Sequence, residues 1–272
     1  TARSNAPWIK LDGAVNGVVS GNGSGTVNFT VDPTVGARSG TITVAEHTFT
    51  VLQEFNACTT ADFSTSPIYQ LQQAGYLTQI LAADFTNDGL LDLAAANNNR
   101  SGPQIEATLL IYPGNSSGGF ASQIKAMTIS GTEASFQKFV AGDLNGDGFR
   151  DLVATGGQNQ NRIFVVLSNG TGGFAPFKEY TEALPLSGVA IGDFNGDNKP
   201  DVAFGVRSFD ANVIVRLNDG AGNLGDPKIL PKAGGSFPVD QIEVADFDGD
   251  NKLDIVSFAQ GPEFVVYKGD GA

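Results

Sequence analysis

The chain has 272 residues, of which 41% are hydrophobic, enough to bury a substantial core in one or two domains. Its 29 acidic residues outnumber the 16 lysines and arginines, for a formal net charge of −13. This excess disfavours nucleic acid and anionic membranes as partners and favours cations. No apolar stretch approaches the roughly 18 residues of a membrane span, so no membrane insertion is expected.

The ends of the chain and its cysteine count give little information about fold or function. The chain begins with Thr1 and stops at Ala272 inside a repeated pattern, so we expect it to be a piece of a longer protein. The only cysteine, Cys58, rules out an internal disulfide. Neither observation indicates an oligomeric state.

Residues 1–55 predict part of a small β-sandwich. Three β-rich runs, TVNFTVD (26–32), GTITVAE (40–46) and TFTVLQ (48–53), alternate with glycine and serine turns. The phrases SNAPWIKL (4–11), VGARSGTITV (35–44) and HTFTVLQ (47–53) resemble the latter part of a BACON domain, an all-β module of bacterial carbohydrate-active and surface proteins. The resemblance implies a truncated BACON-like domain. Trp8 then belongs to its core or edge, with a sugar-binding platform as the alternative.

A linker rich in threonine and serine, residues 56–67, precedes a repeat region at 68–272. One phrase occurs four times in that region: ADFTNDGLLDLAAA, GDLNGDGFRDLVAT, GDFNGDNKPDVAFG and ADFDGDNKLDIVSF. Its first aspartates are Asp84, Asp143, Asp193 and Asp246, so successive copies lie 59, 50 and 53 residues apart. A period of this length suits one small antiparallel sheet per repeat.

A second phrase follows each copy and predicts a strand and a hairpin turn: LLIYPGNSSGGF, FVVLSNGTGGF, VIVRLNDGAGNLG and FVVYKGDGA. In the second repeat we expect strands near 137–142, 151–155, 163–168 and 174–182. Four strands at this spacing are typical of a propeller blade. The predicted fold is therefore all-β, with four blades that form an incomplete ring, because the last repeat stops at its turn.

We call the nine residues that start at each of these aspartates an aspartate loop. Side-chain oxygens at positions 1, 3, 5 and 9 and a carbonyl at position 7 can surround Ca²⁺, and glycine or asparagine at position 6 permits a left-handed turn. The predicted ligands are Asp84, Thr86, Asp88, the Leu90 carbonyl and Asp92; Asp143, Asn145, Asp147, the Phe149 carbonyl and Asp151; Asp193, Asn195, Asp197, the Lys199 carbonyl and Asp201; and Asp246, Asp248, Asp250, the Lys252 carbonyl and Asp254. Up to four ions are expected, with the weakest binding in the first loop, where threonine replaces asparagine or aspartate.

Two alternatives were weighed for these loops. An EF-hand needs a bidentate glutamate at position 12 and flanking helices, but position 12 is Ala95, Ala154, Phe204 or Ser257 and the flanks are strand-like. Solvated Asx turns without metal explain a single copy better than four copies in which the fourth acidic ligand is always present.

The repeats, over about residues 68–272, resemble FG-GAP repeats, also called VCBS-type repeats, of integrin-alpha-like β-propellers. In that family the aspartate loop joins the first two strands of each blade. The resemblance implies structural calcium ions that brace one face of the propeller, while ligands bind elsewhere.

The sequence offers no recognisable active site. His47, the only histidine, is expected in a tight turn, and Cys58 lies in the linker without a neighbouring base. We therefore expect a non-enzymatic, secreted or surface-displayed bacterial scaffold that binds a glycan or an extracellular protein. The alternative is an accessory region of a secreted polysaccharide-degrading enzyme whose catalytic domain lies outside this chain.

Overall fold

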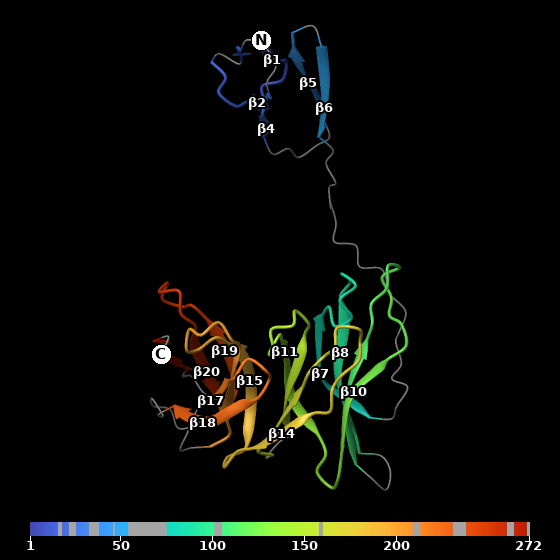
Figure 1. Cartoon of the computed structure of the whole chain (residues 1–272), viewed down its shortest axis with the longest axis vertical. Helices are drawn as coiled ribbons and strands as arrows, with labels where there is room; N and C mark the ends of the chain where they lie inside the picture. Colours follow the sequence, from blue (N-terminus) through green and yellow to red (C-terminus); the bar gives the residue numbers. More distant parts are fainter. Residues whose placement is uncertain are drawn as a thin grey trace. The chain divides into compact units, whose positions relative to one another are not determined.

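The computed structural model describes residues 1–15, 18–21, 26–32, 38–45, 47–53, 75–100, 105–157, 160–208, 213–230, 238–259 and 264–270. Every helix or strand in these residues is a β-strand, which confirms the all-β prediction. The chain divides into two compact units, Thr1–Tyr69 and Gln70–Ala272, coloured blue and teal to red in Figure 1. Within the described ranges no helix has the length and apolar character needed to cross a membrane. The predicted linker and Cys58 lie outside them.

The first unit contains one four-stranded and one two-stranded antiparallel sheet. The larger sheet has the order β3-β1-β5-β6, with β1 (Ala2–Ser4), β3 (Val18–Val19), β5 (Arg38–Val44) and β6 (His47–Gln53). The smaller sheet pairs β2 (Ile9–Leu11) with β4 (Phe29–Val31). Side chains from both sheets share one core: Ala2, Ala6, Ile9, Leu11 and Ile42.

Two residues singled out in the sequence lie in this unit. His47 is exposed and begins β6 opposite Val44, rather than occupying the turn as predicted. Trp8 is half-buried against the core, and the guanidinium carbon of Arg38 lies 4.2 Å from the centroid of its ring. One face of the Trp8 ring is therefore covered by an arginine.

The second unit contains four consecutive antiparallel sheets, which we call blades 1 to 4. Each blade follows the chain order of its strands, and the blades succeed one another across the unit (Figure 1). Blade 4 has three strands in the part of the chain described. The strands are β7 (Tyr76–Ala83), β8 (Asp92–Asn99), β9 (Glu106–Tyr112) and β10 (Ile124–Ser130); β11 (Phe136–Gly142), β12 (Asp151–Gly156), β13 (Arg162–Val166) and β14 (Lys178–Thr181); β15 (Leu186–Gly192), β16 (Asp201–Val206), β17 (Val213–Asn218) and β18 (Leu224–Leu230); and β19 (Val239–Ala245), β20 (Asp254–Ala259) and β21 (Phe264–Tyr267).

The register explains why the two repeated phrases recur together. Each aspartate loop joins the first two strands of its blade, so that Gly142 pairs with Asp151 in blade 2. The glycine-rich phrase, which we call the glycine turn, joins the third and fourth strands in blades 1 to 3. In blade 2 it closes with an isolated bridge between Ser168 and Phe174, and the fourth strand begins only at Lys178, later than predicted.

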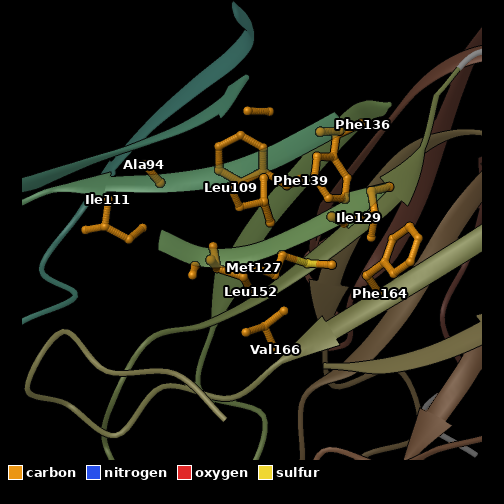
Figure 2. Close-up of a cluster of buried hydrophobic side chains, with 14 of the residues drawn as sticks. Ala94, Leu109, Ile111, Met127, Ile129, Phe136, Phe139, Leu152, Phe164 and Val166 are labelled. Atoms are coloured by element: carbon orange, nitrogen blue, oxygen red, sulfur yellow. The ribbon is translucent and has the colours of Figure 1, made fainter. Parts of the chain in front are cut away.

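The hydrophobic core of this unit lies between neighbouring blades. Figure 2 shows the cluster between blades 1 and 2, which contains Leu109 and Ile111 of blade 1 and Phe139 and Phe164 of blade 2. A second cluster joins blades 2 and 3, and a third joins blades 3 and 4. A single sheet of this kind cannot bury its faces alone, so each blade needs a neighbour, as in other repeat proteins.

Side-chain amides of the first two strands of blade 1 also bond to the first strand of blade 2. The Gln79 amide donates to the Phe139 carbonyl and accepts from the Phe139 N–H, both at 2.8 Å. Asn98 makes the same reciprocal pair with the backbone of Phe136, at 2.9 and 2.8 Å. Blade order is therefore held by directional bonds as well as by apolar packing. The predicted incomplete ring stays a prediction.

Candidate metal sites

The ninth residue of each aspartate loop is a buried aspartate that accepts backbone hydrogen bonds, three in the first loop and two in each of the others. In the second loop, the Asp151 carboxylate accepts from the N–H of Leu144 at 2.9 Å and of Ser168 at 2.8 Å. Equivalent pairs recur at Asp92, Asp201 and Asp254, and all four residues are at most 1% exposed. This side chain ties the loop to the turn that follows the third strand. A carboxylate has about four acceptor positions, so it can also face a cation.

The first residue of each loop organises the loop backbone. Asp143 accepts from the N–H groups of Gly146 at 2.8 Å, Asp147 at 3.1 Å and Gly148 at 2.9 Å. Asp193 and Asp246 make the same three bonds. In the first loop, bonds to Asp84 come from Asp88 and Gly89. The loop backbone thus curls around the carboxylate at position 1.

Positive φ angles occur at two positions of every loop. Position 6 has φ between 62° and 86° at Gly89, Gly148, Asn198 and Asn251, as its residue types predict. Position 4 is also left-handed, at Asn87, Gly146, Gly196 and Gly249, which the sequence reasoning did not foresee. The sequence signal for a left-handed residue at position 4 was glycine or asparagine there, as at position 6, because these residues adopt the left-handed conformation most easily.

The fourth loop brings three carboxylates together. Ligand oxygens of Asp246, Asp248 and Asp254 all lie within 4.8 Å of one another. Among the residues that the structure describes, this is the one group of three or more His, Cys, Asp or Glu side chains so placed. The trio can hold a metal ion, and its all-oxygen donor set suits a hard cation such as Ca²⁺ or Mg²⁺.

The predicted ligands at positions 3 and 5 form bonds within their own loops. Asn145 donates to the Asp147 carboxylate at 2.8 Å, and Asn195 accepts from the N–H of Asp197 at 3.1 Å. In the first loop, the hydroxyl oxygen of Thr86 is buried and has no hydrogen-bond partner among the described residues. These side chains lie in their loops as the pattern predicts, and their role as metal ligands stays a prediction.

Position 7 contributes a backbone bond in all four loops. The N–H of this residue donates to the carboxylate at position 5, at 2.8 to 3.0 Å. The residues are Leu90, Phe149, Lys199 and Lys252. This bond fixes Asp88, Asp147, Asp197 and Asp250, whereas coordination by the carbonyls at position 7 stays a prediction.

Lysines neutralise part of the charge in the last two loops. Lys199 lies 3.3 Å from the Asp197 carboxylate, and Lys268 lies 2.9 Å from the Asp248 carboxylate. Lys252 is 4.0 Å from Asp250. In these exposed pairs, the lysine ammonium groups supply some of the positive charge that a bound metal ion would supply.

Burial and backbone hydrogen bonds have opposite effects on the pKa values of the loop aspartates. Burial raises the pKa of Asp151 to about 6, helped by the charges of Asp147 and Asp143 and opposed by its two backbone bonds. Burial raises the pKa of Asp201 in the same way. Backbone hydrogen bonds instead hold the pKa values of Asp197 and Asp246 below the ordinary range. A nearby cation would therefore favour the charged forms of Asp151 and Asp201.

These sheets and loops define a class: an all-β repeat protein in which acidic loops join the first two strands of consecutive, propeller-type blades. A family model described as FG-GAP-like repeat matches residues 84–154, 143–204 and 193–257. Each match begins at the first aspartate of one loop and ends in the strand after the next loop, so all four loops are included. The matched residues exceed half of the chain, and the chain belongs to the FG-GAP-like repeat family. Residues 1–83 lie outside the match, and their resemblance to BACON domains stays a prediction.

No curated protein matches the sequence. Among solved structures, 35 chains match. One is a crystal structure of BBS1N in complex with ARL6DN, with 13% identity and a TM-score of 0.48, covering 92% of this chain and 69% of that one. Another is the Tc holotoxin pore of Photorhabdus luminescens, with 18% identity and a TM-score of 0.38, covering 92% of this chain and 11% of that one.

Proposed function

We propose that the second unit is a calcium-binding β-propeller scaffold that acts outside the cell and binds a glycan or an extracellular protein without catalysing a reaction. The observation that carries this proposal is the trio Asp246, Asp248 and Asp254, in a loop whose architecture recurs four times. Chance acidic turns do not repeat the same buried aspartate and the same backbone bonds at each copy.

Calcium is the metal best suited to these loops. Every predicted ligand is an oxygen, and Ca²⁺ accepts six to eight oxygens in flexible geometry, whereas Mg²⁺ requires a near-ideal octahedron. The unpartnered hydroxyl oxygen of Thr86 in the first loop is consistent with a ligand at position 3. An ion in each loop would offset the burial that raises the pKa of Asp151 and Asp201.

The absence of catalysis is part of the proposal. The only histidine, His47, is exposed on a strand of the other unit. Asp151 and Asp201, whose pKa values burial raises, accept hydrogen bonds from backbone N–H groups and so shape the loops. A scaffold role leaves the surface away from the aspartate loops for a ligand, and a glycan array probed in the presence of calcium tests the glycan class.

Calcium titration tests the metal directly. We expect Kd values of about 0.1–1 mM, the range of extracellular calcium modules, so that 1 mM Ca²⁺ stabilises the unit by about 0.4–1.4 kcal/mol for each site. EDTA should then lower the melting temperature by about 3 °C or more. Isothermal titration calorimetry and thermal unfolding measure the two effects.

One variant and one control make the titration specific for the fourth loop. Asp248→Asn removes a carboxylate that accepts only from Lys268 in the described structure, so the fold should survive while the affinity of that site falls about tenfold. Asp226→Asn removes the same charge from exposed β18 and should leave calcium binding unchanged. Absence of both binding heat and an EDTA effect on the wild-type protein would refute the calcium proposal.

A further inference from the structure

The second aspartate loop contacts the blade that follows its own. Leu144, at position 2 of this loop, is fully buried in the cluster that joins blades 2 and 3, together with Val202 and Phe204 of blade 3. Phe85, at position 2 of the first loop, is buried in the same way between blades 1 and 2. Each of these two loops is therefore held against the next blade by an apolar side chain.

Asn218 of blade 3 adds a polar contact to the second loop. It is the last residue of β17 and is 3% exposed. Its side-chain nitrogen donates to the carbonyl of Leu144 at 2.6 Å, and to the carbonyl of Pro200, at position 8 of the third loop, at 3.0 Å. The amide therefore bridges the aspartate loops of two blades. Its oxygen is buried without a hydrogen-bond partner among the described residues, which is unfavourable for an amide that only fills space.

The backbone of Asn218 completes a chain of hydrogen bonds between the two loops. Its N–H donates to the carboxylate of Asp201, at position 9 of the third loop, at 2.8 Å. At the other end, the N–H of Leu144 donates to the carboxylate of Asp151, at position 9 of the second loop, at 2.9 Å. Three hydrogen bonds thus connect two carboxylates that are both predicted calcium ligands.

The residue equivalent to Asn218 differs in the other blades. In all four blades this residue donates its backbone N–H to the aspartate at position 9, from Gly114, Ser168, Asn218 and Gly269. The glycines have no side chain, and the hydroxyl oxygen of Ser168 accepts from the N–H of Gly170 in its own glycine turn at 3.1 Å. Within the described ranges, the bridge to the preceding loop is therefore made by Asn218, and Ser168 shows that the fold accepts serine at this position.

Given the calcium binding proposed above, we infer that Asn218 couples the calcium sites of the second and third loops, so that an ion in either loop strengthens binding in the other. An ion in the second loop orders the loop backbone, including the Leu144 carbonyl, and thereby holds Asn218 and the carboxylate of Asp201 in place. An ion that enters the third loop then has fewer groups to order, which makes its binding more favourable. Coupling of this kind is reciprocal.

Calcium titration followed by NMR tests the coupling one loop at a time. The backbone amides of Gly148 and Asn198, both at position 6, report on the second and third loops separately. Asp147→Asn should weaken binding in the second loop and still accept from the Phe149 N–H through its side-chain oxygen. We expect this variant to raise the Kd of the third loop about fivefold, the lower end of usual coupling between sites. Reciprocity requires Asp197→Asn to raise the Kd of the second loop by the same factor.

Two background variants locate the coupling. In Asn218→Ser protein, the addition of Asp147→Asn should leave the Kd of the third loop unchanged within about twofold, because the bridge is absent. Lys178→Met is the matched control. Lys178 of blade 2 donates to the Ala221 carbonyl of blade 3 at 3.2 Å, outside the chain of bonds, so the coupling should stay about fivefold in this background. The pair separates loss of the bridge from a general loss of contact between the blades.

The possible results distinguish failure of the coupling from failure of calcium binding. Coupling through Asn218 is overturned if calcium shifts the Gly148 and Asn198 amides but Asp147→Asn leaves the Kd of the third loop unchanged. It is also overturned if the fivefold effect persists in Asn218→Ser protein or disappears in Lys178→Met protein, and in all these cases the calcium sites remain. If calcium shifts no loop amide of the wild-type protein, the calcium proposal and the coupling both fail.

Discussion

Aspartates at different positions of one nine-residue loop have different structural roles. The carboxylate at position 9 is buried and joins two segments of its blade, whereas the carboxylate at position 1 is more exposed and shapes the loop backbone. Burial without a cation disfavours the charged form, and backbone N–H donors favour it. Asp151 is the position where burial prevails, because its pKa is raised to about 6.

In calcium-free protein we predict that Asp151 titrates near pH 6. Its folded-state pKa lies above the value of 3.8 for an ordinary aspartate, so protonation favours the folded state. This contribution to stability is fully present below about pH 4 and is lost as the pH rises through about 6. Carboxyl-carbon NMR in EDTA measures the titration, with Asp197, whose pKa is lowered, as an internal control. Titration of Asp151 near pH 4 would contradict the prediction.

Within a blade, the aspartate loop and the glycine turn can pack closely against each other. Gly170, in the glycine turn of blade 2, has φ +71°, and a Cβ there would clash with the ring of Phe149 in the aspartate loop. Gly118, in the glycine turn of blade 1, has a similar φ of +79° but has open space around the position of a Cβ. The two glycines therefore separate backbone strain from steric contact.

We predict that Gly170→Ala destabilises the protein more than Gly118→Ala does. Both substitutions force alanine into a left-handed conformation at a cost of about 1–2 kcal/mol. Gly170→Ala must also displace the Phe149 ring, for about 1–3 kcal/mol more. Urea unfolding in calcium measures both free energies, and equal losses would show that the two turns do not pack as described.

Across the whole unit, stability comes from contacts between blades. One of these contacts is a buried ion pair: Arg216 of blade 3 donates to Glu182, which follows β14 of blade 2, at 2.5 Å between Nε and Oε1. Both side chains are less than 10% exposed, and the Arg216 guanidinium also donates to the Gly225 carbonyl and lies 5.5 Å from the centroid of the Tyr180 ring. A buried pair of this kind is costly to break from one side.

We predict that Arg216→Met costs about 3–5 kcal/mol in the free energy of unfolding, because Glu182 is left buried without its partner. The double variant Arg216→Met, Glu182→Leu should recover much of that loss, since no charge is left unpaired. As a control, Glu179→Gln removes the exposed pair with Arg162 and should cost at most about 1 kcal/mol. Urea unfolding of the four proteins tests this, and a loss for Arg216→Met no larger than that of the control would count against a role in blade packing.

Local patterns in the sequence predicted much of the second unit. The aspartate phrase and the β-branched runs act over about ten residues, so they revealed the all-β class, the loops between the first two strands and the left-handed turn at position 6. The same reasoning placed the start of the fourth strand of blade 2 too early, because the bridge at Phe174 is separated from β14 by residues without regular pairing.

Contacts between repeats could not be predicted from the sequence. The side chains that meet across blades, such as Gln79 with Phe139 and Arg216 with Glu182, are separated by 60 and 34 residues and have no shared local pattern. The ion pair between Lys268 and Asp248 likewise depends on how the last strand packs beside the aspartate loop. Turns and strands are determined by the residue types of short segments, so they can be predicted from the sequence. Packing between sheets depends on strand register and sheet twist, which are set by residues far apart in the chain.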